Sequence, residues 1–303
     1  MRPLITGATG FVGKQLLRHV ERPVILSRDA ARAKGALGDY LFDAYDWNAE
    51  KQPAPAAAFE GVDTVFHLAG EPIAEGRWTA EKKFRLRESR VAGTRHLVET
   101  LAKLPPADRP KVLISASAVG YYGSRGDEIL DESRPPATDF LGEICSSWER
   151  EAAQAEALGI RVCLLRIGIV LGRDGGALEK MVPAFKSWAG SRLGSGKQWV
   201  PWIHLQDLVD LLLFVAERAS LHGPVNAVAP HPVTNADFTQ ILAKQLGALT
   251  LLPPVPAFAL KAMLGEFGAV LLGSQRVVPK VALDAGFRFT YPTLDAALRE
   301  ILT

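Results

Sequence analysis

Short apolar runs alternate along the chain with longer segments whose apolar residues recur every three or four positions. The runs at 4–6, 23–27, 62–70, 111–117 and 161–166 are mostly apolar and end at small or charged residues. Runs of this length with little polar alternation are typical of strands that are buried on both faces. They predict five strands of a parallel sheet.

The segments between these runs have helical periodicity. Residues 79–104 suit one long helix that ends before the proline-rich stretch 105–110, and a further strand is expected within 38–47. Residues 142–158 suit a second helix. Its apolar face is formed by Ile144, Cys145, Trp148, Ala152 and Ala155.

Strand and helix alternate through the first half of the chain, which predicts the α/β class with a doubly wound parallel Rossmann sheet. Beyond about residue 170, segments rich in glycine, tryptophan and proline interrupt the alternation. We therefore expect a dinucleotide-binding Rossmann domain over 1–170, to which later segments can return. A smaller C-terminal substrate domain over 171–303 should close over the carboxyl edge of the sheet, where ligands of such folds bind.

Three glycines follow the first strand at a spacing of three residues. The stretch "ITGATGFVG" places Gly7, Gly10 and Gly13 between the strand and a helical pattern. The first glycine allows the turn, the second lets backbone approach a ligand, the third lets helix and strand pack, and the helix N-terminus faces a phosphate. This arrangement predicts dinucleotide binding, and Thr9 and Phe11 between the glycines belong to the same predicted site.

The end of the second strand favours NADP over NAD. NAD-selective sites have an acidic residue there, about 20 residues after the glycine turn, which binds the ribose hydroxyls. This chain has Ser27 and Arg28 instead. A guanidinium can pair with the 2′-phosphate of NADP and stack on adenine. Asp29 follows directly, but its side chain should point elsewhere.

Composition excludes several other classes of protein. The 303 residues are 48% hydrophobic and carry a formal charge of +2 without long basic runs, which argues against nucleic acid as a partner. No apolar segment approaches membrane length. The glycine turn lies so near Met1 that no signal peptide is expected, and the predicted compartment is the cytoplasm. Two cysteines and six scattered histidines provide no metal-ligand pattern.

Four motifs carry a resemblance to a known family. In this order and at these spacings, "TGATGFVG", "VFHLAG", "SASAVGYYG" and "LLRIGIVLG" resemble the extended short-chain dehydrogenase/reductase family of NAD-dependent epimerases and dehydratases. More narrowly, "HLAGEPI", "VPWIHLQDL" and the tail 253–301 resemble its atypical epimerase-like subgroup with a C-terminal domain of unknown function. The resemblance covers nearly the whole chain.

The resemblance implies further cofactor contacts and a homodimer as the family's common assembly. The adenosine and ribose side would be lined by the end of the 62–70 strand, Arg90 would reach the cofactor from the long helix, and the segment after the 161–166 strand would pass the nicotinamide. The residues so implied are Leu68, Ala69, Gly70, Arg90, Ile167 and Ile169.

The family's usual acid/base pair is missing. A Tyr-x-x-x-Lys pair on one helical face, with a serine or threonine, moves a proton in this family, and the lysine lowers the pKa of the tyrosine. The matching helix positions here are Leu141 and Cys145, which cannot do this. The serine position falls at Ser117, or at Ala118 if the strand is aligned without Gly120.

Another acid must therefore serve if hydride chemistry occurs. Tyr122 and Glu71 are the candidates, since both lie on loops at the carboxyl edge, although each could equally be a structural loop residue. Cys145 as a nucleophile is a weaker alternative to Cys145 as a core residue. Val200 and Pro201 stand where many nucleotide-sugar epimerases have an Arg-Asp that grips a diphosphate.

Two functions follow from these observations. The first is an NADP-dependent oxidoreductase or epimerase-like enzyme with a non-standard acid/base group and an unknown small-molecule substrate. The second is a catalytically silent NADP(H)-binding module that senses the nucleotide or binds a partner. Oxidation of bound NADPH by a carbonyl compound would distinguish them.

Overall fold

The structure is a computed structural model that describes residues 1–38 and 40–303. Its centre is a seven-stranded sheet in the order β3-β2-β1-β4-β5-β7-β11, with all neighbouring strands parallel. The strands are β1 (Pro3–Thr6), β2 (Val24–Ser27), β3 (Asp43–Asp46), β4 (Thr64–His67), β5 (Val112–Ala118), β7 (Arg161–Ile167) and β11 (Gly223–Ala227). This is a doubly wound order whose direction reverses between β1 and β4. The predicted α/β class and Rossmann sheet are confirmed.

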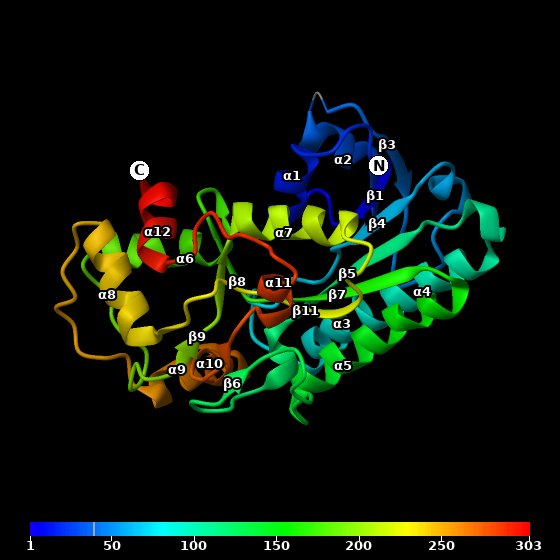
Figure 1. The fold of residues 1–303 in the computed structure, drawn as a ribbon. Helices are drawn as coiled ribbons and strands as arrows, with labels where there is room; N and C mark the ends of the chain where they lie inside the picture. Colours follow the sequence, from blue (N-terminus) through cyan, green and yellow to red (C-terminus); the bar gives the residue numbers. More distant parts are fainter. Residues whose placement is uncertain (39) are drawn as a thin grey trace.

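Helices cover both faces of the sheet (Figure 1). One face carries α1 (Phe11–Leu17), α2 (Ala30–Leu37) and α7 (Leu205–Glu217), and the other carries α4 (Val91–Lys103) and α5 (Phe140–Ala153). Leu4 and Ile5 of β1 pack against opposite faces, and both are fully buried. Burial on both faces explains why these strands have no polar alternation in the sequence.

The single helix predicted over 79–104 is wrong in its continuity. The chain forms α3 (Ala80–Glu88) and then α4, with a break at Ser89 and Arg90. The Ser89 hydroxyl donates to the Leu86 carbonyl and accepts the Glu71 amide, while the Arg90 side chain also donates to Leu86. Side chains that bond backbone groups in this way compete with regular helix hydrogen bonds.

The other predicted elements differ only at their ends. Helix α5 begins at Phe140, because the Asp139 side chain accepts the Gly142 amide as an N-cap, and it continues as the 3-10 helix η4 (Gln154–Leu158). The five residues predicted on its apolar face are all buried. The strand expected within 38–47 is β3, and residue 39 of that range lies outside the described residues.

After residue 170 the chain builds a smaller part and also returns to the sheet. Helix α7 packs on the sheet beside α1, and β11 pairs with β7 as its edge strand. The smaller part has its own core around Trp202, Phe238 and Leu298. Its elements are β8 (Ile169–Gly172), α6 (Gly176–Lys186), β9 (Trp199–Val200), β10 (Trp202–His204), β12 (Val233–Thr234), α8 (Asn235–Gln245) and α12 (Leu294–Leu302).

The C-terminal segment runs back toward the sheet before it ends on α12 (Figure 1). It contains α9 (Ala257–Leu264), α10 (Glu266–Leu271), β13 (Arg276–Val277) and α11 (Lys280–Asp284), and β13 pairs with the short strand β6 (Ile129–Leu130). The remaining short helices are η1 (Ala56–Phe59), η2 (Pro106–Asp108) and η3 (Val119–Tyr122). Within the described residues, none of the helices has the length and apolar character needed to cross a bilayer.

Candidate functional site

The glycine loop joins β1 to α1 at the carboxyl edge of the sheet. Gly7 has a φ of +73°, and a Cβ there would lie 2.9 Å from the Leu68 carbonyl carbon. A Cβ on Gly13 would lie 2.3 Å from the Gly7 oxygen, so the start of the helix touches the turn. A Cβ on Gly10 would meet only the Gly7 oxygen, at 3.2 Å. The space in front of Gly10 is therefore open to a ligand.

The amides that follow Gly10 can bind an anion. Gly10 itself donates to the Gly7 carbonyl, and Lys14 donates to the Gly10 carbonyl. The amides of Phe11 and Val12 donate to no acceptor within residues 1–38 and 40–303. Unpaired backbone N–H groups at the start of a helix are typical of phosphate-binding loops.

The Phe11 ring lies against the segment that joins β8 to α6. A Cβ on Gly172, Gly175 or Gly176 would lie 2.7 to 2.9 Å from the Phe11 ring. These glycines let the backbone of the smaller part lie directly on the ring. Phe11 therefore ties the glycine loop to the smaller part.

A buried network fixes the turn after β4 beside the glycine loop. The Thr6 hydroxyl accepts the Leu68 and Ala69 amides, both at 3.1 Å, and lies 2.8 Å from His67 Nδ1. Its own proton must then go to Nδ1, so His67 carries its proton on Nε2 and donates to the Thr94 hydroxyl at 2.9 Å. The turn that precedes Gly70 is thus bonded to β1 at the site where the family resemblance expects adenosine.

His67 should make stability fall in mild acid. Burial lowers the pKa of His67 to about 4, against about 6.5 in an unfolded chain. The folded state therefore stays neutral while the unfolded state gains a proton, and stability is lost as the pH falls from about 6.5 to about 4, by about 3 kcal/mol in total. Urea unfolding across this range should show the loss in the native protein, and His67→Gln should lack this component. Equal pH dependence in both proteins would contradict the assignment.

The end of β2 carries an arginine without an ion pair among the described residues and an aspartate that caps a helix. Arg28 is exposed and forms no ion pair with any described residue. Asp29 caps α2, since its side chain accepts the Arg32 amide at 2.8 Å. The Ser27 hydroxyl donates to the Asp29 carbonyl at 3.1 Å. As predicted, the Asp29 carboxylate is turned away into a structural role.

Glu71 is held in an ion pair. Lys82 Nζ lies 2.7 Å from Glu71 Oε1, and Arg85 Nε lies 3.6 Å from it. The hydrogen bond from Lys82, the charge of Arg85 and the charge of Arg28 lower the pKa of Glu71. The ionised form is therefore favoured, which suits a fixed negative charge better than a proton donor. The predicted catalytic role of Glu71 stays a prediction.

The Arg90 side chain lies between the turn after β4 and helix α5. Its guanidinium donates to the Glu71 and Leu86 carbonyls at 3.0 and 3.1 Å, passes within 3.3 Å of the Cβ position of Gly70, and lies 5.3 Å from the Trp148 ring centroid. Burial lowers its pKa. No carboxylate among the described residues pairs with it. An anionic group of a ligand would satisfy this charge.

Ser117 belongs to a buried polar network behind the edge of the sheet. Its hydroxyl donates to Glu149 Oε1 at 2.7 Å, and Arg166 binds both oxygens of Glu149, at 2.8 and 2.9 Å. Arg166 also donates to the Tyr122 hydroxyl at 3.0 Å, which in turn donates to the Asn226 side chain at 2.6 Å. Sequence reasoning missed Arg166 and Glu149, because each looks like an ordinary charged residue in its own element.

The two tyrosines of η3 have different surroundings. Tyr122 is fully buried, and burial raises its pKa to about 12. Tyr121 is partly exposed, and its ring centroid lies 3.5 Å from the centre of the Arg166 guanidinium. Tyr122 was the residue chosen from the sequence, and its catalytic role stays a prediction. The motif contains both tyrosines without a signal that separates them.

Leu141 and Cys145, the two helix positions at which the resemblance expects the Tyr-x-x-x-Lys pair, lie together on α5. Both face Gly120, whose Cβ position is 3.2 Å from Leu141 Cβ and 3.8 Å from Cys145 Sγ. Burial raises the pKa of the Cys145 thiol to about 12, so a reactive thiolate is disfavoured. On the next strand, Ile167 and Ile169 are both partly exposed at the end of β7 and the start of β8.

The C-terminal segment holds the turn that carries the tyrosines. Gln275 donates to the Val119 carbonyl at 2.8 Å and to the Gly123 carbonyl at 3.1 Å. Ser274 donates to the Gly126 carbonyl at 2.7 Å. Sequence reasoning gave this segment no specific role, since polar residues in a tail with no periodicity carry no signal for a particular contact.

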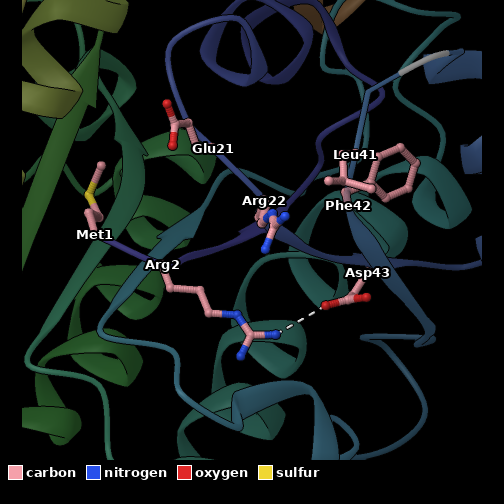
Figure 2. A pocket seen from close by; sticks show the side chains of 7 residues that line it. All are labelled: Met1, Arg2, Glu21, Arg22, Leu41, Phe42 and Asp43. Carbon is pink, nitrogen blue, oxygen red and sulfur yellow. Dashed lines mark hydrogen bonds and ion pairs between the residues drawn. The ribbon is translucent and has the colours of Figure 1, made fainter.

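A cavity of about 690 Å³ lies elsewhere, at the amino ends of the strands (Figure 2). It is lined by Met1, Arg2, Glu21, Arg22, Leu41, Phe42 and Asp43. Arg2 and Asp43 form an ion pair of 3.0 Å there. Ligands of doubly wound sheets bind at the opposite, carboxyl edge. None of the predicted site residues lines this cavity, and the candidate site is therefore the carboxyl edge described above.

Within the described residues, no group of three or more His, Cys, Asp or Glu side chains is arranged to hold a metal ion.

Comparisons with known proteins find two matching family models and several similar chains. The NAD dependent epimerase/dehydratase family matches residues 3–228, and a domain of unknown function, DUF1731, matches residues 255–301. The chain is 40% identical to the Epimerase family protein SDR39U1 homolog, chloroplastic, of Arabidopsis thaliana, over 98% of this chain and 86% of that protein. It is 36% identical to Epimerase family protein YfhF of Bacillus subtilis, over 100% of this chain and 98% of the other.

A solved structure shares the whole fold. The crystal structure of human epimerase family protein SDR39U1 (isoform 2) with NADPH is 30% identical, with a TM-score of 0.84, and the match covers 100% of this chain and 99% of the human one.

Proposed function

The chain belongs to the NAD dependent epimerase/dehydratase family, and we propose that it is an NADP-dependent oxidoreductase or epimerase-like enzyme of the extended short-chain dehydrogenase type without the Tyr-x-x-x-Lys pair. Its substrate would be a carbonyl compound or the corresponding alcohol. The observation that carries the proposal is the glycine loop, in which the Phe11 and Val12 amides are unpaired within the described residues and Gly10 leaves room for a ligand.

The carboxyl edge offers a coherent set of groups to hold this cofactor. The loop amides suit the pyrophosphate, the turn after β4 suits the adenosine side, Arg90 offers a charge for a phosphate, and the end of β7 suits the nicotinamide. The residues proposed for this role are Gly7, Thr9, Gly10, Phe11, Gly13, Ser27, Arg28, Leu68, Ala69, Gly70, Arg90, Ile167 and Ile169. When bound, the cofactor supplies or accepts a hydride.

The choice of NADP rests on the end of β2. Arg28 is exposed and without an ion pair in the described part of the chain, and the Asp29 carboxylate is bonded to the Arg32 amide. A carboxylate facing the ribose would repel a 2′-phosphate, whereas a free guanidinium would bind it with charge-assisted hydrogen bonds. The human relative with NADPH supports the same choice.

We expect NADPH to bind at least about tenfold more tightly than NADH, which corresponds to about 1.4 kcal/mol. Arg28→Ala should remove most of this difference, because the 2′-phosphate loses its cation while the rest of the nucleotide keeps its contacts. Calorimetric titration of both nucleotides into both proteins measures the effect.

Arg22→Ala is the matched control for this measurement. It removes the same charge at the amino end of β2, at the cavity on the far edge of the sheet. The control should keep the preference for NADPH. Equal affinities for the two nucleotides in the native protein would refute NADP specificity. If Arg22→Ala also lost the preference for NADPH, the preference would depend on the overall charge of the protein and not on Arg28.

A silent NADP-binding module is the second candidate. It is favoured by the contact of Leu141 and Cys145 with Gly120, which fills the usual acid/base position with apolar groups. Such a protein would bind NADPH with the same preference and would not oxidise it in the presence of any carbonyl compound.

A further inference from the structure

A polar group lies next to the apolar position where the family's pair is missing. Gly120 contacts Leu141 and Cys145, and Tyr121 is the next residue along the chain. The charges of Arg166 and Glu149 both shift the pKa of Tyr121, in opposite directions. The turn after β5 therefore carries a phenol on the residue that follows Gly120, beside the two apolar helix positions.

Tyr121 is accessible and has a cation against its ring. Its side chain is partly exposed, whereas Tyr122 is fully buried and its hydroxyl is bonded to Arg166 and Asn226. The Arg166 guanidinium lies 3.5 Å from the centroid of the Tyr121 ring, within the range of a cation–π contact. Of the two tyrosines, only Tyr121 can meet a ligand without rearrangement of the core.

The cation is held in one position. Arg166 is 3% exposed and forms two hydrogen bonds to Glu149, which also accepts the Ser117 hydroxyl. Burial opposes the charge of Arg166, but the bonds to Glu149 outweigh it, so its pKa is raised and it stays charged. Burial raises the pKa of Tyr121 while the charge of Arg166 lowers it.

The turn itself is clamped from the C-terminal segment. Gln275 binds the carbonyls on both sides of the tyrosines, at Val119 and Gly123. The Tyr121 carbonyl accepts the Ala137 amide at 2.8 Å. A proton donor must keep its place through the reaction, and these bonds fix the backbone that carries the phenol.

Resting on the proposed function, we propose that Tyr121 is the proton donor of this site and that Arg166, positioned by Glu149, takes the part of the family's lysine. The carbonyl carbon of a substrate would receive a hydride, with its two electrons, from NADPH held at the carboxyl edge. The carbonyl oxygen takes the hydroxyl proton of Tyr121 and becomes the alcohol. The Tyr121 phenolate would then take up one proton (H⁺) from the solvent, so that one carbonyl, one NADPH and one proton give one alcohol and one NADP⁺.

Tyrosine titration tests the proposal without a substrate. The chain has five tyrosines, so the signal is assigned by difference between the native protein, Tyr121→Phe and Tyr122→Phe, each followed by tyrosinate absorbance against pH. Saturation with NADP⁺ should lower the pKa of one tyrosine by about 1 unit or more, because the nicotinamide ring is positively charged. This transition should be absent in Tyr121→Phe and present in Tyr122→Phe. A titration unchanged by NADP⁺, or a transition lost only in Tyr122→Phe, overturns the proposal.

A test of the role of Arg166 requires a variant in which no charge is left buried without a partner. Arg166→Met combined with Glu149→Gln removes both charges and should fold. In this double variant the pKa of Tyr121 should rise relative to the native protein, because the nearer of the two charges was the cation. An unchanged pKa would overturn the role of Arg166.

Measurements of turnover and of NADPH binding distinguish a failure of the Tyr121 proposal from a failure of the proposed function. With a carbonyl substrate, Tyr121→Phe should lower kcat by about 10² to 10⁴-fold with the Kd for NADPH unchanged, a larger loss of kcat than in Tyr122→Phe. Equal kcat values in Tyr121→Phe and the native protein would refute Tyr121 as the proton donor and leave the proposed function standing. Failure of the native protein to bind NADPH refutes the proposed function itself. If NADPH binds but no carbonyl compound is reduced, the titration still decides whether Tyr121 faces the cofactor.

Discussion

Gly10→Val is expected to abolish NADPH binding while the protein stays folded. Gly10 has a φ of −77° and a ψ of 173°, which any residue can adopt, and its Cβ position meets only the Gly7 oxygen, at 3.2 Å. A valine there requires the Gly7 carbonyl to shift by only a few tenths of an ångström, and its side chain would fill the space in front of the Phe11 and Val12 amides. In a melting experiment, NADPH at about 100 times its Kd stabilises a binding-competent protein by about 2.7 kcal/mol. The variant should melt near the native temperature and show no such gain.

Gly13→Val provides the contrast, because there the added side chain meets the fold and not the ligand. Its Cβ would lie 2.3 Å from the Gly7 oxygen and 2.7 Å from Ala8 Cα. This variant should itself be less stable, by about 1–3 kcal/mol or more. A ligand-induced gain that survives in Gly10→Val would contradict the cofactor site, and equal melting temperatures for the two variants would contradict the packing given for the loop.

Local pattern was enough to predict the sheet and the glycine loop. Leu4, Ile5 and their counterparts in β2, β4, β5 and β7 are buried on both faces, so these strands appear as unbroken apolar runs. The glycine spacing after β1 predicted the turn because one strand, one loop and one helix suffice to form it. The break between α3 and α4 was missed, since it depends on Ser89 accepting the amide of Glu71, which is distant in sequence.

The polar network behind the edge could not be predicted in the same way. Ser117, Glu149 and Arg166 come from β5, α5 and β7, and only the sheet order brings them together. The choice between Tyr121 and Tyr122 also depends on the fold. Within the 3-10 turn two adjacent side chains point in different directions, and the sequence contains no signal for which of them meets Asn226.

The strand with which the chain returns to the sheet, β11, was also hard to locate from the sequence. The edge strand β11 (Gly223–Ala227) begins with glycine and proline and contains Asn226, so it lacks the apolar run of the other strands. It joins the sheet because β7 offers a free edge and because Asn226 satisfies Tyr122 and the Leu130 and Val278 carbonyls. Tertiary contacts override local propensity at such a position.

Glu149→Gln should destabilise the protein by about 3–5 kcal/mol, because it leaves the charge of Arg166 buried without a partner. The side chains of this pair are 4% and 9% exposed, and Arg166 has no second carboxylate among the described residues. Glu151→Gln is the matched control on the same helix: its partner Arg95 is 52% exposed, so the freed charge stays in water and the cost should be about 0–1 kcal/mol.

Urea unfolding of the single variants and of Glu149→Gln with Arg166→Met measures these costs. The double variant should recover much of the stability lost in Glu149→Gln. In Glu149→Gln the charge of Arg166 is buried without a partner, and Arg166→Met removes that charge. The comparison also bears on the chemistry, since the ion pair that joins β7 to α5 is the one that holds the guanidinium against the Tyr121 ring. If Glu149→Gln costs no more than Glu151→Gln, water must reach Arg166, and its guanidinium cannot act on Tyr121 through a dry contact.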